Sequence, residues 1–174
     1  MMKRLFKYLG YTLLFSPALA WADTKATVDW TPFFKSWEQG CDFGKDGAAL
    51  KQNLFKSNKF NRLVLPAKYA ASAVKPTVSR KQDKDGLNKV NIAYIPIKNG
   101  TYYGLPISAI EYTVGTDNGI NYRIMTFEAP HAAVRAKLKS VKYKAEVSEA
   151  MGTTFQASLD KQKTKAVLLC DASV

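Results

Sequence analysis

Glu111 and Glu128 are the residues of this chain whose type and placement come closest to acid–base chemistry. Hydrolysis of a glycosidic bond needs two carboxyl groups that face each other across a cleft, and the two can be far apart in sequence. Both glutamates lie in segments with the alternating pattern of a β-sheet, so they could approach each other on adjacent strands. Because alternation gives every strand a polar face, ordinary solvated or paired sheet residues are the simpler interpretation.

The sequence offers no second catalytic set. The single histidine, His131, stands at the start of an expected helix, where a surface or capping role is typical. No serine lies in a G-x-S-x-G motif, and no glycine-rich phosphate loop follows a strand. Asp83, Asp85 and Gly86 resemble part of a calcium loop, but Lys84 interrupts them and the downstream acidic ligands are missing. We therefore expect no cofactor and no metal.

Residues 1–22 have the composition of a secretory signal peptide. Lys3, Arg4 and Lys7 precede an apolar run, and small residues at Ala20 and Ala22 favour cleavage after Ala22. The run is shorter than the ~20 residues that cross a bilayer, and no later stretch is long and apolar enough. We therefore expect one exported domain over residues 23–174, in the periplasm or secreted, that does not span a membrane.

Cys41 and Cys170 are the only cysteines. In an exported protein an even count indicates a disulfide, because that compartment is oxidising. A crosslink over so long a loop stabilises a fold by ~4–5 kcal/mol in the chain-entropy model, and strain usually lowers this figure. Oxidised sulfurs are also unavailable as nucleophiles or metal ligands.

The segment from Trp30 to Cys41, WTPFFKSWEQGC, carries an aromatic stripe. Its rings recur at helical spacing, Cys41 continues the stripe, Thr31 and Pro32 favour a helix start, and Gly40 suits its end. One interpretation is a helix that packs its rings into the core and is held there by the disulfide. The other is an aromatic groove for a glycan, peptide or lipid. We favour the core, since small domains bury such stripes.

The remaining pattern predicts an α+β fold, with a helical N-terminal segment packed on an antiparallel β-meander that carries one inserted helix and is closed by one disulfide. A two-residue turn is expected at Asn99–Gly100, and hairpins are expected around Asp85–Gly86 and across Asp160–Lys163. The other expected elements are helices at 48–55 and 130–139 and strands at 90–94, 108–114, 122–127, 143–147, 155–159 and 166–170.

Charge is distributed unevenly along the chain. Residues 41–89 hold eleven basic side chains against four acidic ones, and residues 131–165 hold eight against three. The strands between them are nearly neutral. This pattern is typical of a basic protein surface, and it also suits an anionic partner such as an acidic protein, lipid phosphate or nucleic acid. Export makes nucleic acid the least favoured of the three, and no aromatic stacking motif supports it.

Tyr102 and Tyr103 follow the expected turn, and neighbouring strand residues point to opposite faces, so one of the two is expected to face outward. Exposed tyrosine on a rigid hairpin is common at protein interfaces, although it is also ordinary strand composition. The leading hypothesis is a non-enzymatic periplasmic binding protein, such as an inhibitor or immunity protein that blocks a toxin or envelope hydrolase. The alternatives are a carboxylate-dependent cell-wall or glycan hydrolase and an envelope structural or adhesion component.

Overall fold

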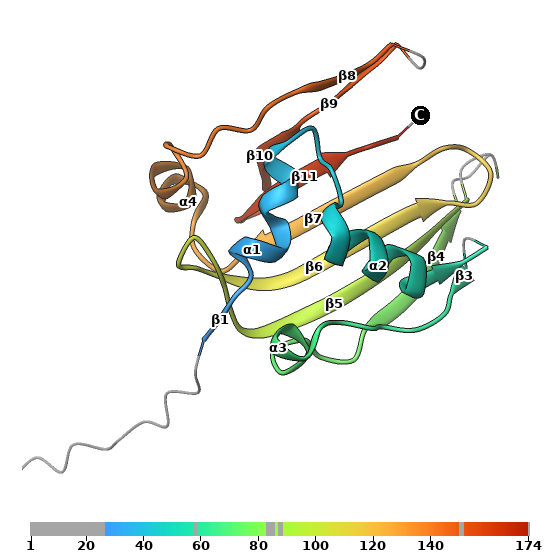
Figure 1. Ribbon diagram of the computed structural model, residues 1–174, viewed down its shortest axis with the longest axis horizontal. Helices are drawn as coiled ribbons and strands as arrows, with labels where there is room; N and C mark the ends of the chain where they lie inside the picture. Colours follow the sequence, from blue (N-terminus) through green and yellow to red (C-terminus); the bar gives the residue numbers. More distant parts are fainter. Residues whose placement is uncertain (1–26, 58, 83–85, 87–88, 150–151, 174) are drawn as a thin grey trace, which may run out of the picture.

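The computed structural model describes residues 27–57, 59–82, 86, 89–149 and 152–173. The predicted signal peptide, its cleavage point and the Asp83–Asp85 pair lie outside the described residues. The described part is a mixed α+β fold in which a large, mainly antiparallel sheet carries short helices (Figure 1). The predicted α+β class is therefore confirmed.

The centre of the molecule is a four-stranded meander. The strands β4 (Thr77–Gln82), β5 (Lys89–Tyr102), β6 (Leu105–Gly115) and β7 (Asn121–Phe127) pair in sequence order, each antiparallel to the next. Pairing of β4 with β5 confirms the hairpin predicted around Gly86.

Three more strands complete the sheet. The C-terminal hairpin of β10 (Ala157–Gln162) and β11 (Lys165–Asp171) adds to β7, and Ala157 lies opposite Cys170. The hairpin was predicted, but the turn expected across Asp160–Lys163 is wrong, because β10 continues through Gln162. At the other side β1 (Val28–Asp29) runs parallel to β5.

The predicted turn at Asn99–Gly100 is wrong. β5 continues through these residues, and the turn comes later at Tyr103 and Gly104, both with positive φ. Asn99 has φ of 55° at a break in the β5–β6 register. A Cβ at Gly100 would collide with Ile97 and lie 2.9 Å from the indole nitrogen of Trp30, so this glycine admits the Trp30 ring rather than forming a turn.

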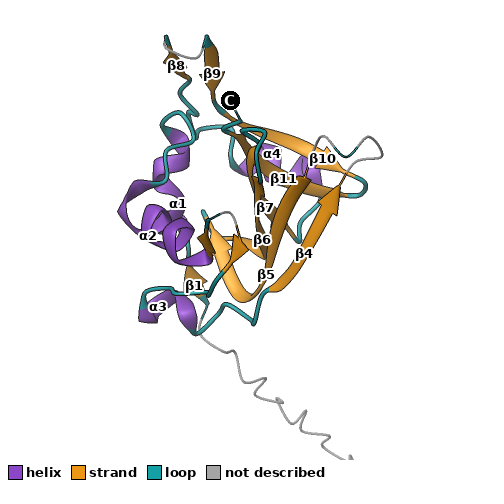
Figure 2. Cartoon of the chain, turned by 90° about the vertical axis from the view of Figure 1, so that its right-hand side faces the viewer, coloured by secondary structure: helices purple, strands orange, loops and turns teal. Residues whose placement is uncertain are grey.

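Short helices lie against one face of the sheet. The N-terminal segment forms one turn of α-helix, α1 (Thr31–Phe34), and then a 3₁₀ turn, η1 (Lys35–Glu38), where a longer helix was expected. α2 (Gly44–Leu54) and α3 (Ala67–Ala70) follow it. Figure 2 shows α1, α2 and α3 together on one side of the sheet.

The remaining elements lie around the sheet. The inserted helix α4 (His131–Lys137) contacts β10 and β11. Two small hairpins complete the described chain, as β2 (Phe55–Lys56) with β3 (Lys59–Phe60) and β8 (Glu146–Ser148) with β9 (Thr153–Phe155).

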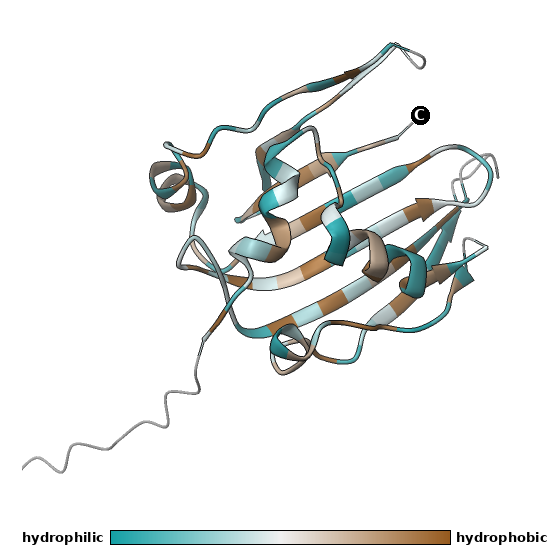
Figure 3. Ribbon diagram, viewed as in Figure 1, coloured by the Kyte–Doolittle hydropathy of each residue, from teal (hydrophilic) through white to brown (hydrophobic). Residues whose placement is uncertain are grey.

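The aromatic stripe forms the centre of the core between these helices and the sheet. All its rings are buried, namely Trp30, Phe33, Phe34 and Trp37. Trp30 packs against Tyr69 of α3 with ring centroids 4.7 Å apart, and Phe34 meets Trp37 at the same distance. Hydropathy alternates along the strands beneath them (Figure 3). The stripe is therefore core in this structure.

The disulfide between Cys41 and Cys170 is present and buried. It joins the end of the N-terminal helical segment to the inward face of β11, with the two Cα atoms 5.5 Å apart. Gly40, with φ of 58°, provides the chain reversal just before Cys41. The crosslink thus fixes the aromatic segment onto the sheet.

Candidate functional site

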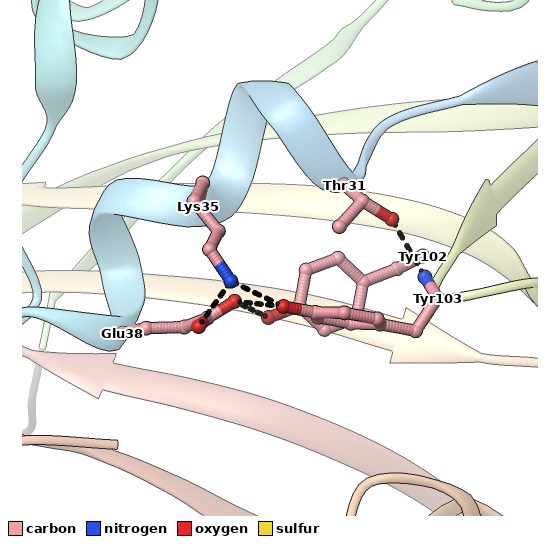
Figure 4. A network of polar contacts seen from close by, with 5 residues as sticks. All are labelled: Thr31, Lys35, Glu38, Tyr102 and Tyr103. Atoms are coloured by element: carbon pink, nitrogen blue, oxygen red, sulfur yellow. Dashed lines mark hydrogen bonds and ion pairs between the residues drawn. The ribbon is translucent and has the colours of Figure 1, made fainter. Parts of the chain in front are cut away.

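A buried carboxylate organises the tip of the β5–β6 hairpin (Figure 4). The Oε1 atom of Glu38 accepts hydrogen bonds from the hydroxyls of Tyr103, at 2.7 Å, and Tyr102, at 3.3 Å. Its Oε2 atom pairs with Lys35 Nζ at 2.8 Å. The backbone N–H of Tyr103 also donates to Thr31 Oγ1 at 2.7 Å. Both carboxylate oxygens are therefore used inside the protein.

The protonation states of this network follow from its burial and its contacts. Burial raises the pKa of Tyr102 far above its usual value, and it raises the pKa of Tyr143, which lies nearby, to about 12. Hydrogen bonds to Glu38 and Tyr103 raise the pKa of Lys35. At neutral pH the lysine is charged and the tyrosines are protonated, so the network is fixed rather than ready for proton transfer.

This network decides how the two predicted interface tyrosines can act. Tyr102 is 0% exposed, and its ring stacks edge-on against that of Tyr103. An interface role for Tyr102 would need its side chain to leave the core. Tyr103 is partly exposed, but its hydroxyl is held by Glu38 and Lys35. Surface contact by tyrosine at this hairpin thus remains a prediction for Tyr103 alone.

Strand register separates the two candidate catalytic glutamates. Glu111 lies opposite Ile124 in β7, whereas the N–H of Glu128 bonds to the carbonyl of Pro106. Pro106 and Glu111 are five positions apart in β6, which corresponds to about 16 Å along the strand. Retaining and inverting glycosidases hold their carboxyl groups roughly 5–10 Å apart. This backbone spacing gives no support to a glycosidase pair.

The other predicted positions show no reactive arrangement. His131 is the first residue of α4, as expected. Among the described residues no group of three or more His, Cys, Asp or Glu side chains could hold a metal ion. In the same part of the chain, no helix combines the length and apolar character needed to cross a bilayer.

The face of the sheet turned away from α1, α2 and α3 carries a further surface, here called the open face. Residues opposite one another in a ladder share a face, so the register places Tyr94, Glu111, Ile124 and Leu169 in one row. Tyr94 is 39% exposed, and the other three are partly exposed. The full open face comprises the exposed or partly exposed Tyr94, Glu111, Tyr122, Ile124, Thr126 and Leu169, together with the buried Ile92, Thr113 and Val167.

A hollow of about 300 Å³ lies on the open face. Tyr94, Thr126 and Val167 line it from the strands, Lys163 lines it from the β10–β11 turn, and Lys165 lines it from the start of β11. Both lysines are exposed. The hollow therefore combines an aromatic and aliphatic floor with a positively charged rim.

Sequence reasoning missed one feature, a buried arginine. Arg123 in β7 is 1% exposed, and its side chain shares the inward face with Met125 and Phe127. The guanidinium carbon lies 3.8 Å from the ring centroid of Phe43 and 5.7 Å from that of Trp37. Burial lowers the pKa of Arg123 to about 10. Strict alternation from Phe127 and Met125 could have placed this arginine inward.

No protein-family model, no curated protein and no solved structure matches this chain.

Proposed function

We propose that this protein is an exported, non-enzymatic binding protein that holds an acidic protein partner on the open face of its sheet. The observation that carries the proposal is the combination of Tyr94 and a lysine rim with three partly exposed residues, Tyr122, Ile124 and Leu169. Side chains on paired strands are rigid, so they lose little entropy on binding.

The positive net charge of the chain supports an acidic partner. Removal of residues 1–22 takes away Lys3, Arg4 and Lys7 and lowers the formal net charge from +12 to +9. A strongly positive surface attracts acidic proteins and repels basic ones. An inhibitor or immunity protein fits this description, because its task is to cover another protein rather than to catalyse a reaction.

The first test concerns export. Mass spectrometry of the protein recovered from a Gram-negative envelope should show a chain that begins at Asp23. An intact chain beginning at Met1 would contradict the proposal.

The second test concerns the open face. Protein captured from an envelope extract should be lost with Tyr94→Ala and with Lys165→Glu. It should be retained by Val147→Ala, which changes a 65% exposed residue on β8. Capture should also weaken as salt rises, since surface charges are screened over ~10 Å at 0.1 M. Equal capture by Tyr94→Ala would reject the open face, and glycan cleavage that depends on Glu111 would favour the hydrolase instead.

A further inference from the structure

Two cations lie against one aromatic ring on the helix-covered side of the sheet. The Phe43 ring centroid is 3.8 Å from the guanidinium carbon of Arg123 and 4.6 Å from Lys51 Nζ. Burial and the nearby Arg123 charge both lower the pKa of Lys51. Lys51 is partly exposed, whereas Arg123 is buried. Attraction to the ring offsets only part of the cost of burying Arg123 near a second positive charge.

No carboxylate neutralises this pair within the described residues, where the one ion pair joins Lys35 to Glu38. Asp42 exerts a favourable charge effect on Arg123, but its two oxygens accept backbone N–H groups of Phe43 and Gly44. Buried charges in proteins are normally paired and hydrogen-bonded. The Arg123 charge is therefore missing its counter-ion.

Three buried polar atoms at this place also lack hydrogen-bond partners. They are Nε and Nη1 of Arg123 and the hydroxyl of Tyr112, which lies directly opposite Arg123 in the β6–β7 ladder. Nε and the Tyr112 hydroxyl can each donate one hydrogen bond, and Nη1 can donate two. A guanidinium edge beside a hydroxyl matches the oxygens of a carboxylate or phosphate.

A cavity of about 330 Å³ adjoins these groups. Phe43 and Lys51 form part of its wall, and Phe55 and Val114 supply buried apolar surface. Its rim at Gln52 is exposed. Arg123 does not line the cavity, because the partly exposed Phe43 ring lies against its guanidinium. Tyr112 does not line the cavity either, so binding of a ligand to these two residues would require the Phe43 ring to rotate.

We infer that this cavity binds an anionic amphiphile, whose carboxylate or phosphate head meets Arg123, Lys51 and Tyr112 while its apolar body lies on Phe55 and Val114. The volume is at the lower end of that of small-molecule sites, so the apolar body is short or only partly enclosed. This site is on the face opposite the proposed protein-binding surface, and neither depends on the other.

Calorimetric titration of the mature chain tests this inference with four probes that share a ten-carbon tail: decanoate, decyl phosphate, 1-decanol and decyltrimethylammonium, each kept below its micelle-forming concentration. At least one anion should bind about tenfold or more tightly than the alcohol, because the alcohol carries no charge to pair with Arg123 and Lys51. The cation should not bind.

Comparison of the two anions separates a fatty-acid ligand from a phospholipid-type ligand. Inorganic phosphate, which has no apolar tail, should bind more weakly than decyl phosphate.

Matched variants assign the site. Lys51→Met should weaken anion binding about tenfold, because one charge is lost, while Lys45→Met on the same helix should leave it unchanged. Arg123→Met should abolish anion binding. If the Arg123→Met protein does not fold, the comparison of Lys51→Met with Lys45→Met decides the matter. Equal affinity for decanoate and 1-decanol, no binding of either anion, or wild-type affinity in Lys51→Met would overturn the inference.

Discussion

The hydroxyl of Tyr103 donates a 2.7 Å hydrogen bond to Oε1 of Glu38, which ties the tip of the β5–β6 hairpin to the turn that follows α1. The same carboxylate pairs with Lys35 and accepts from Tyr102. The N-terminal segment is thus held by polar contacts at η1 and by the disulfide just after it, so its aromatic rings have one orientation over the sheet.

Loss of this carboxylate should destabilise the fold. Glu38→Ala leaves the buried Tyr102 hydroxyl without this acceptor and should cost about 1–3 kcal/mol in free energy of unfolding. Loss of the ion pair with Lys35 should add little to this cost, because Lys35 is exposed to solvent. Chemical denaturation measures the change, with Glu128→Ala, at an exposed glutamate, as the control. Equal stability of the two variants would show that the network contributes nothing.

The aromatic stripe should act as core rather than as a binding groove. Trp37→Ala should cost ~3–5 kcal/mol through the cavity it leaves, and Cys41→Ser should cost ~2–5 kcal/mol through loss of the crosslink. Both residues belong to one buried cluster, so the double variant should lose less than the sum. Thermal unfolding with and without reductant measures this, and Tyr94→Ala is the exposed aromatic control. An unshifted melting temperature in Trp37→Ala would restore the groove interpretation.

Replacement of the buried arginine should not destabilise the ligand-free protein. Arg123→Met removes an unpaired buried charge and keeps most of the side-chain volume, a change that is often neutral or stabilising. We therefore expect an equal or higher melting temperature for protein freed of amphiphiles by organic extraction and refolding. Arg62→Met, at an exposed position, is the control. A large drop in melting temperature would mean that the contacts with Phe43 and Trp37 outweigh the cost of the buried charge.

Stability should fall as pH rises above about 10, the ordinary tyrosine pKa. Burial raises the pKa values of Tyr102, Tyr112 and Tyr143 in the folded state, so above pH 10 the unfolded chain releases protons that the folded chain keeps. Their contribution is fully present below pH 10 and is lost as pH rises toward the folded-state pKa values. The lowered pKa values of Lys51 and Arg123 act in the opposite direction.

The variant Tyr112→Phe isolates the contribution of the Tyr112 hydroxyl to this pH dependence of stability. Thermal unfolding measured between pH 8 and 11 should show a shallower decline for this variant than for the wild type, and tyrosinate absorbance should rise with unfolding. Tyr94→Phe, at an exposed position, should follow the wild type. Identical declines for Tyr112→Phe and the wild type would contradict the assigned burial of this hydroxyl.

Several elements could be predicted because their signals are local. Alternation in β5, β6 and β7 reports a half-buried strand directly. The two cysteines left one possible intramolecular pair. The misplaced hairpin turn shows the limit of such signals. Asn99–Gly100 satisfies the local rule for a turn, but Gly100 is required by the Trp30 ring, which comes from a distant part of the chain.

The sequence by itself determined the α+β class, the disulfide and the α4 helix, since each follows from residue type and spacing along the chain. It favoured burial of the aromatic stripe, and the structure decided between that and a groove. Tertiary structure alone decided which side chains meet. Register set the distance between Glu111 and Glu128. The tertiary fold also brought Tyr102 to the carboxylate of Glu38, and it brought Lys51 and Arg123 to the ring of Phe43. These relations depend on strand offset and helix placement, which arise from the summed packing of the whole core and leave no signal within a short stretch of sequence.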